Sequence, residues 1–429
     1  MKRLTFSEIS NYSRLRGDRI IDRTRANQVR DILSYVKTSG DAALTELSLK
    51  FDGVDFSEVT VPSELSFDDF ALLKALKVAS DNINAFHKPQ LRSDYKIELG
   101  RGLFLQRLIR PISRVGFYIP GGSAPLISTL MMLVIPAKLA GCKDFVLCTP
   151  PSAQGIDPSL LLAARYFGID KIYALGGAQA IGAMAYGTET IPKVDKIFGP
   201  GNFFVNEAKR QVSTDPNGAA IDLPAGPSEI MVVAEAGANA RFIASDLLSQ
   251  AEHDAEAQII FVSLDLDLTE KVLNEIQSLV GTLSRQTTAM AALEKAIFVD
   301  VRAKNEALEI TNAFAPEHLI LHVNDSEAWL PEIENAGSIF CGPYSPEVAG
   351  DFASGTNHVL PTDGAARAYS GLGVESFQKT ISVQTLSKEA FLDLAPTLLT
   401  FAAKEGLDAH ALAVKVRLQE AGEINNENN

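Results

Sequence analysis

The spacing of apolar residues predicts helices at both ends of the chain. Within residues 24–51 apolar side chains recur every three or four positions, as in an amphipathic helix, at Val29, Ile32, Leu33 and Val36. The stretch TSGD then supplies a stop and a new N-cap, so two helices are predicted here. Amphipathic spacing returns in residues 66–88 and dominates after residue 385. We therefore expect a largely helical N-terminal part and a helical C-terminal tail.

Between these ends, short apolar runs predict the strands of parallel sheets. From residue 113 onward, runs that end at Gly or Pro recur about every 25–30 residues, namely RVGFYIP, DFVLCTP, KIYALGG and VDKIFGP. A second series begins at residue 229 and comprises EIMVVAE, AQIIFVSLD, KAIFVDV, HLILHV and SIFCG. Helical stretches separate most of these runs, which is the pattern of βαβ units with both sheet faces covered. The sequence thus predicts an α/β fold with two α/β/α domains, one inserted in the other.

These changes in pattern divide the chain into four segments. Residues 1–110 are expected to hold N-terminal helices and the start of the outer α/β domain, and residues 111–227 to form the inserted domain. Residues 228–380 then complete the outer domain, and residues 381–429 form the helical tail. The last residues, EINNENN, are expected to be disordered, as chain ends often are.

Composition and charge are those of a soluble protein with more than one domain. A chain of 429 residues is too long for one compact core, and its 46% hydrophobic and 21% charged residues are typical of globular proteins. The net charge of −14 argues against nucleic acid or an anionic membrane as a partner. The longest apolar run, LMMLVIPAKLAG, is interrupted by Pro136 and Lys138, well short of the ~20 residues of a membrane span.

Cysteine content and the N-terminus predict a cytoplasmic location. The chain has three cysteines, too few for a disulfide framework, which fits a reducing compartment. The N-terminal stretch MKRLTFSEISNYSRLRGDR lacks the apolar segment of a secretory signal.

Three Gly-containing turns follow predicted strands and suggest a dinucleotide site. They are YIPGGSAP at residues 118–125, LGGAQAIG at residues 175–182 and FGPGNFF at residues 198–204. Main-chain N–H groups at such strand-to-helix turns attract phosphate, although none of the three has the spacing G-x-G-x-x-G. Tyr118, Gln179 and Asn202 stand beside these turns, at the sheet edge where α/β proteins bind ligands. A half-buried tyrosine, an early helix residue and a helix cap would explain the same three residues without a ligand.

The histidines suggest metal binding or acid–base catalysis. In LLSQAEHDAEAQ, residues 247–258, Gln250 and His253 share one helix face, where an amide oxygen and an imidazole could converge on a metal. A helix whose polar side faces water explains this stretch equally well. Of the six histidines, His87 and His322 are expected to be structural. The others stand near carboxylates, in FAPEHL, AGDFASGTNH and AKEGLDAH as well as in SQAEHD.

Two candidate sites follow from these clusters. Two histidines, one aspartate and one amide oxygen form a borderline donor set that Zn²⁺ accepts, but the spacing lacks the compactness of H-E-x-x-H. The adjacent Glu317 and His318 stand at a turn that enters a strand, where both side chains can face a cleft. An imidazole suits a general base near neutral pH, and a carboxylate can deprotonate water.

Taken together, these stretches resemble histidinol dehydrogenase. The matching residues are, in chain order, YIPGGSAPL, GGAQAIGAMAYGT, KIFGPGN, DLPAGPSE, DLLSQAEHD, APEHL, GDFASGTNHVLPT and LSKEAF. They begin at residue 118 and end near residue 390, and the helical ends of the chain also fit the family. Each motif alone is weak, but so many in the same order make the resemblance specific.

The resemblance implies an activity, two cofactors and an assembly. The family oxidises L-histidinol to L-histidine through L-histidinal, at the end of histidine biosynthesis, with two NAD⁺ and one zinc ion per subunit. It forms homodimers in which the C-terminal tail of one subunit reaches the active site of the other. The implied fold consists of two incomplete Rossmann-like domains in an aldehyde-dehydrogenase-like arrangement.

The same resemblance assigns roles to residues of this chain. The implied zinc ligands are Gln250, His253, Asp351 and His410. The implied substrate contacts are Ser228, Gln250, His253, His318, Asp351, Glu405 and His410. The implied NAD⁺ contacts are Tyr118, Gln179 and Asn202. His318 would take the hydroxyl proton and assist the second hydride step, and Glu317 would deprotonate the water that attacks the aldehyde.

Other functions are compatible with parts of the sequence. Aldehyde oxidation often uses a thiolate, but neither Cys142 nor Cys148 has a histidine near it, and Cys341 ends an apolar strand. All three are therefore expected to be buried small apolar residues. A related dehydrogenase for another small alcohol, a hydrolase with zinc-bound water, and a non-catalytic metal-binding or scaffold protein are the remaining alternatives.

Overall fold

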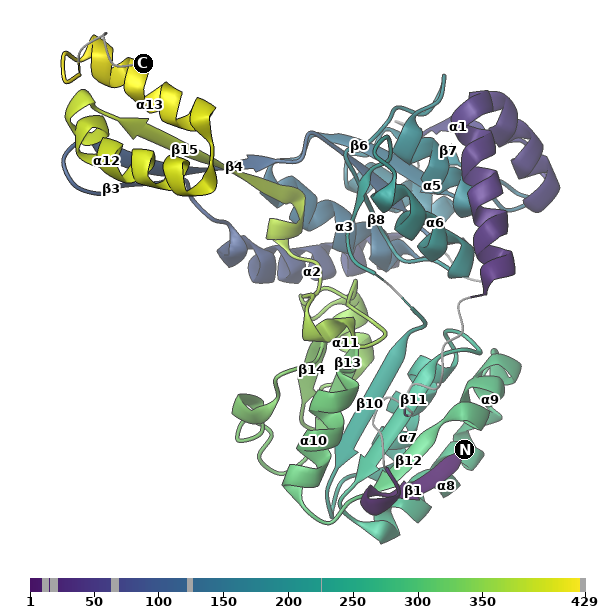
Figure 1. Ribbon diagram of the computed structural model, residues 1–429. Helices are drawn as coiled ribbons and strands as arrows, with labels where there is room; N and C mark the ends of the chain where they lie inside the picture. Colours follow the sequence, from purple (N-terminus) through teal and green to yellow (C-terminus); the bar gives the residue numbers. More distant parts are fainter. Residues whose placement is uncertain (10–14, 16–21, 63–68, 122–125, 225, 425–429) are drawn as a thin grey trace. The chain divides into compact units, whose positions relative to one another are not determined.

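A computed structural model describes residues 1–9, 15, 22–62, 69–121, 126–224 and 226–424 of the chain (Figure 1). These residues form two compact units. The first comprises Met1–Gln90 and Ile112–Phe377, and the second comprises Leu91–Pro111 and Gln378–Asn429. Residues 122–125 of the first glycine turn and residues 425–429 of the EINNENN stretch lie outside the described part.

One sheet of the first unit is wholly parallel, as the continuous apolar runs predict. Its order is β1-β12-β11-β10-β13-β14. Its strands are β1 (Lys2–Thr5), β10 (Glu229–Ala234), β11 (Gln258–Ser263), β12 (Ile297–Asp300), β13 (His318–His322) and β14 (Ser338–Cys341). The strand β1 at the N-terminus pairs with β12, far along the chain. The residues between β1 and β10 that form a second sheet are therefore inserted into the domain that contains the first. The expected insertion is confirmed.

The inserted sheet has the order β2-β7-β6-β5-β8-β9, and β2 alone among these strands runs antiparallel to its neighbour. Its strands are β2 (Ser57–Thr60), β5 (Arg114–Tyr118), β6 (Asp144–Thr149), β7 (Lys171–Ala174), β8 (Lys196–Phe198) and β9 (Ala220–Ile221). The chain proceeds from β5 through β6 to β7 on one side and then crosses to β8 on the other. This reversal makes the carboxyl ends of β5 and β8 the switch point of the sheet, where ligands bind in α/β folds.

Helices cover both faces of the inserted sheet and enclose two apolar cores. Alternate residues of one strand serve opposite faces, since Leu147 of β6 enters one core and Cys148 enters the other. One face is covered by α1 (Arg23–Phe51), α5 (Gly177–Tyr186) and α6 (Phe203–Thr214), and the other by α2 (Phe70–His87), α3 (Ile127–Ala140) and α4 (Pro158–Tyr166). Gly40 has φ 53° and kinks α1, which confirms the two predicted helices there.

The outer sheet is covered in the same way. One core lies under α7 (Ala240–Ala251), α8 (Leu266–Val280) and α9 (Gln286–Lys295), and the other lies under α10 (Lys304–Phe314). The short helix α11 (Glu347–Phe352) follows β14 and packs on α7. Short 3₁₀ turns complete this unit at Phe6–Glu8, Lys88–Gln90, Leu330–Glu332, Ala365–Arg367 and Val374–Phe377.

The second unit combines an antiparallel sheet with the helical tail. Its strands, in the order β15-β4-β3, are β3 (Tyr95–Glu98), β4 (Leu103–Pro111) and β15 (Gln378–Leu386), and its helices are α12 (Lys388–Glu405) and α13 (Asp408–Glu420). The helical tail is confirmed. The three strands were not expected, because their residues are mostly half-buried or exposed and lack a continuous apolar run.

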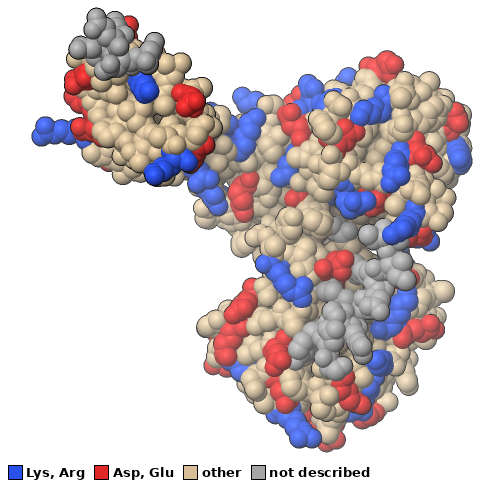
Figure 2. All heavy atoms as spheres, in the orientation of Figure 1, with Lys and Arg blue, Asp and Glu red and all other residues tan. Residues whose placement is uncertain are grey.

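In the view of Figure 2, basic and acidic side chains are interspersed, and neither sign of charge dominates the surface. No helix among the described residues is both long enough and apolar enough to cross a bilayer.

Candidate active site

Glu317 and His318 stand at the amino end of β13, where the main chain of Glu229 holds both side chains. The Glu229 N–H donates to Glu317 Oε2 at 2.8 Å, and the Glu229 carbonyl oxygen accepts from His318 Nδ1 at 2.9 Å. The preceding helix α10 ends at Phe314 because Pro316 cannot continue it, and Ala315 adopts φ 55° at the turn. This tight turn delivers the pair directly onto the strand. Both side chains are buried.

The hydrogen bond to Glu229 fixes how the His318 imidazole can act. A carbonyl oxygen only accepts, so Nδ1 carries the hydrogen of the neutral ring and Nε2 carries the lone pair. The Nε2 atom is buried and has no hydrogen-bond partner within the described residues. Burial lowers the pKa of His318, with Asp351 opposing the shift, so the ring is neutral at neutral pH. His318 is therefore ready to accept a proton at Nε2.

Three carboxylates surround the His318 ring. Glu317 Oε2 lies 3.7 Å and Glu347 Oε1 3.4 Å from Nδ1, and Asp351 Oδ1 lies 3.9 Å from Nε2. Burial raises the pKa of Glu317 well above its ordinary range, against the hydrogen bond from the Glu229 N–H, and the neighbouring carboxylates raise it further. A carboxylate with a raised pKa is a stronger base, which suits it to deprotonating water.

A group of metal-ligand side chains adjoins His318. The ligand atoms of His253, Glu347 and Asp351 lie within 4.8 Å of one another. Helix α7 ends before His253, which therefore lies in the turn after it and, contrary to the prediction, does not share a helix face with Gln250. The Gln250 side chain is buried, and its Oε1 lacks a hydrogen-bond partner in the described part of the chain. An unpaired buried amide oxygen costs free energy unless a cation or donor satisfies it. Imidazole nitrogen, amide oxygen and carboxylate oxygens form a donor set that fits Zn²⁺.

The local fold explains how these distant residues meet. Glu347 and Asp351 are four residues apart on α11 and so share one face. The Ser249 hydroxyl on α7 donates to Glu347 Oε2 at 3.4 Å, which joins α11 to the helix that carries Gln250. The structure thus brings His253, Asp351 and the Glu317–His318 pair to one place.

The other expected substrate residues fall in two places. Ser228 is half-buried and directly precedes Glu229, and therefore lies at the end of β10 next to Glu317 and His318. Glu405 is the last residue of α12 and His410 lies in the first turn of α13, so both belong to the second unit, where they are exposed.

The expected cofactor residues gather at the carboxyl ends of the inserted sheet's strands. The Tyr118 hydroxyl at the end of β5 accepts from the Gly177 N–H at 3.0 Å, and burial raises the pKa of Tyr118 to about 12. Gln179 is buried in the first turn of α5. Asn202 caps α6, with its side-chain oxygen accepting from the N–H groups of Phe204 and Val205. The Tyr118 and Asn202 side chains thus have structural roles, and both residues flank the switch point.

A buried ion pair supports the turn after β8. The Lys209 ammonium contacts Asp222 Oδ1 at 2.5 Å and donates to the Gly199 carbonyl oxygen at 2.8 Å. The Gly199 N–H donates to Asp222 Oδ2 at 2.8 Å. Gly199 has φ 119°, and a Cβ atom there would lie 2.1 Å from the Tyr118 carbonyl oxygen, so no other residue fits. This turn is rigid and closely packed on β5.

Sequence reasoning missed two residues of the site. Glu229 acts through its main chain, and the sequence around it gives no sign of that role. Glu347 precedes Asp351 by four residues and shares its face on α11, but no helix was predicted at these residues, so the pairing was not found.

Cys142 and Cys148 are buried as expected, whereas Cys341 is only half-buried, so the expectation was wrong for that residue. Cys148 is fully buried and burial raises its pKa, while burial raises the pKa of Cys142 to about 11. Because the thiolate is the reactive form, iodoacetamide is expected to leave Cys148 unmodified in the folded protein while it alkylates the half-buried Cys341. Mass spectrometry of peptides from the alkylated protein measures this. Rapid alkylation of Cys148 would contradict it.

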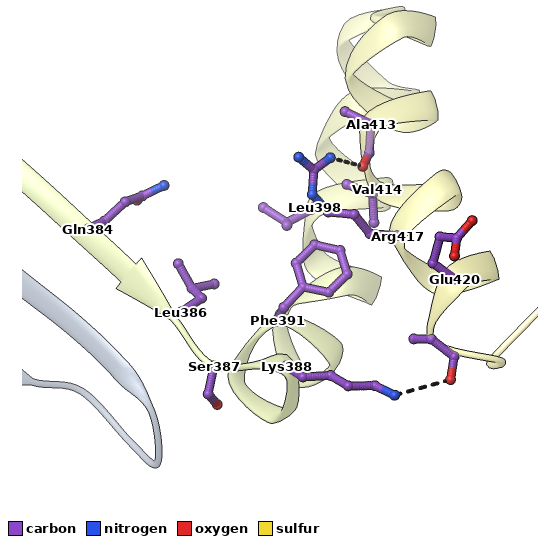
Figure 3. A pocket seen from close by; sticks show the side chains of 11 residues that line it. Gln384, Leu386, Ser387, Lys388, Phe391, Leu398, Ala413, Val414, Arg417 and Glu420 are labelled. Carbon is purple, nitrogen blue, oxygen red and sulfur yellow. Dashed lines mark hydrogen bonds between the residues drawn. The ribbon is translucent and has the colours of Figure 1, made fainter.

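A groove in the second unit has a different character. It lies between the end of β15 and the two tail helices, with Phe391, Leu398 and Val414 in its apolar lining (Figure 3). Lys388 and Arg417 each donate to a main-chain carbonyl oxygen, at 3.3 and 2.7 Å. Lys388 thus binds the carbonyl oxygen just after α13, and Arg417 binds one within α13. Packing between the two tail helices therefore accounts for the residues that line this groove.

Comparisons with known proteins agree on one family. A family model described as histidinol dehydrogenase matches residues 17–418. The histidinol dehydrogenase of Xanthomonas euvesicatoria pv. vesicatoria is 46% identical over 432 residues, covering 97% of this chain and 99% of that protein. That of Vibrio parahaemolyticus is 48% identical and covers 91% of each chain. The crystal structure of histidinol dehydrogenase from Elizabethkingia anophelis matches with a TM-score of 0.91 and 41% identity, over 98% of this chain and 99% of that one.

Proposed function

Because this chain belongs to the histidinol dehydrogenase family, we propose that it oxidises L-histidinol to L-histidine in two NAD-linked steps through L-histidinal. The observation that carries the proposal is that the main chain of one residue, Glu229, fixes two different bases. The main chain of Glu229 orients Glu317 and leaves the lone pair of His318 Nε2 free beside the metal-ligand group. A two-step oxidation needs one base for the alcohol and one for water.

The two bases divide the proton transfers between them. His318 Nε2 takes the hydroxyl proton as the alcohol carbon loses its hydride. Glu317 then takes a proton from water as that water adds to the aldehyde, and His318 returns its proton to the former carbonyl oxygen, which gives the hydrate needed for the second oxidation and leaves His318 neutral. His318 takes the hydrate's hydroxyl proton in the second step. The raised pKa of Glu317 makes its carboxylate a stronger base, and the lowered pKa of His318 keeps its imidazole neutral and able to accept a proton.

Residues of both units would hold the metal and the substrate. Gln250, His253 and Asp351 supply donors from the first unit, and His410 of the partner subunit completes the set in a homodimer. Zinc, when bound, supplies a Lewis acid that orients the imidazole and amine of the substrate. Ser228 and Glu405 would contact the substrate, with the Glu405 carboxylate facing the substrate's amine.

The inserted domain would bind NAD⁺ at its switch point. Tyr118 and Asn202 flank that point, and Gln179 lies in the helix that follows β7. The N-terminal ends of α5 and α6 face the same edge, and their helix dipoles favour the pyrophosphate. NAD⁺ supplies the hydride acceptor for both steps.

The stoichiometry of NADH tests the proposed function. When L-histidinol is consumed to completion, two NADH are expected for each substrate molecule. Pretreatment with a chelator should abolish NADH formation, and added Zn²⁺ should restore it, because the donor set fits that ion. A ratio near one would overturn the role of Glu317. Absence of reduction with NAD⁺ still bound would mean that the substrate is a different alcohol.

A further inference from the structure

Glu347 is a buried carboxylate with no assigned role in the proposed reaction. Only 1% of its surface is exposed, and it is the first residue of α11. Its carboxylate lies within 4.8 Å of the ligand atoms of His253 and Asp351. It therefore occupies the same small volume as two of the expected metal ligands.

The hydrogen bonds of Glu347 are incomplete. Oε1 has no hydrogen-bond partner within the described residues, and Oε2 accepts a single long bond of 3.4 Å from the Ser249 hydroxyl. His318 Nδ1 lies 3.4 Å from Oε1, but its hydrogen is already donated to the Glu229 carbonyl. A buried carboxylate is strongly disfavoured unless hydrogen bonds or a cation compensate it.

The electrostatics at this position call for a cation. The buried Glu347 carboxylate lies within 4.8 Å of the Asp351 carboxylate, so two acidic groups share this position. A divalent ion beside Glu347 and Asp351 would balance their two negative charges. It would also satisfy the unpaired oxygens of Glu347 and Gln250.

We propose that Glu347 is itself a ligand of the metal, so that the first unit holds the ion through Gln250, His253, Glu347 and Asp351. The proposal rests on the proposed function for the identity of the ion as zinc. Four ligands complete the coordination that Zn²⁺ prefers, so one subunit retains its ion before the partner's histidine engages. Because Glu347 lies against the His318 ring, ligation also places the ion beside the base.

The affinity for Zn²⁺ in the absence of substrate tests this proposal. The full-length protein is stripped of metal and titrated with Zn²⁺ against a chromogenic chelator. Glu347→Gln keeps the shape of the side chain but removes its charge, and it is expected to weaken binding by about 100-fold or more, beyond the usual effect of a supporting residue. His410→Ala is expected to lose less affinity than Glu347→Gln.

Glu317→Gln is the matched control. It makes the same change in another buried carboxyl beside His318, 3.7 Å from Nδ1, and it is expected to bind Zn²⁺ as tightly as the unaltered chain. Equal affinities of Glu347→Gln and Glu317→Gln would overturn the proposal. Turnover of L-histidinol is measured separately, so zinc binding that depends on Glu347 without turnover would contradict only the proposed function.

A measurement on the unaltered protein covers the case in which Glu347→Gln does not fold. A crystal structure of the zinc-loaded protein without substrate is expected to show a Glu347 oxygen about 2.0–2.2 Å from the ion. A Glu347 carboxylate outside the coordination sphere of the bound ion would overturn the proposal.

Discussion

Replacement of Glu317 by glutamine is expected to stop the reaction at the aldehyde. The amide oxygen can still accept the Glu229 N–H, so the position of His318 and the first oxidation are retained. The amide cannot take a proton from water, and the second oxidation should therefore slow by about 10²–10⁴-fold. A single-turnover experiment that follows NADH should show one fast equivalent per active site in place of two.

The control for this prediction is Glu327→Gln, which makes the same chemical change at an exposed position. It should yield both equivalents at the normal rates. Equal slowing of the two steps in Glu317→Gln would contradict the assignment of Glu317 to water activation, because a base needed only for hydration has no part in the alcohol step.

Much of the fold could be predicted because its central strands are recognisable locally. Each strand of a parallel sheet that is covered on both faces is a continuous apolar run, and all of His318–His322 is buried. The strands β1 and β2 were missed for the opposite reason. Each has only four residues, mostly exposed, and becomes a strand by docking on the edge of a sheet. Such strands depend on tertiary contacts that periodicity does not reveal.

The site was predictable where residue type carries the chemistry. Glu317 and His318 stand together in the sequence and remain together in the structure, at the predicted turn into a strand. Residue type does not indicate the role of Glu229, because its main-chain N–H and carbonyl make the hydrogen bonds to Glu317 and His318. The approach of α11 to α7 is likewise a product of packing, so His253 and Glu347 meet only in the folded chain.

Glu229 makes the two bases interdependent. The main-chain N–H and carbonyl of Glu229, at the start of β10, set the orientation of Glu317 and the tautomer of His318. The Glu229 carboxylate in turn accepts the Asp363 N–H at 2.8 Å, which ties the loop after β14 and α11 to the same point. Any shift of this strand end would move both bases at once, and this is why the site lies on a central strand and not on a free loop.

Replacement of His318 by glutamine is expected to slow both oxidations by about 10²–10⁴-fold, the largest effect of any single change at this site. The glutamine amide has no lone pair on nitrogen for a proton, whereas His318 Nε2 offers one that no other described group occupies. Both NADH equivalents should appear slowly and at similar rates in a single-turnover experiment, unlike the selective loss expected for Glu317→Gln.

His322→Gln is the control that distinguishes loss of the His318 base from disruption of β13 packing. His322 lies four residues further along the same strand, is buried, and contacts Asp246 Oδ2 through Nε2 at 2.9 Å. Because four residues along a strand return to the same face, this change disturbs the same layer at its other end. It should lower the melting temperature but leave both oxidation rates largely intact. If His322→Gln slowed turnover as severely as His318→Gln, strand packing would explain the loss, and His318 would not be the base.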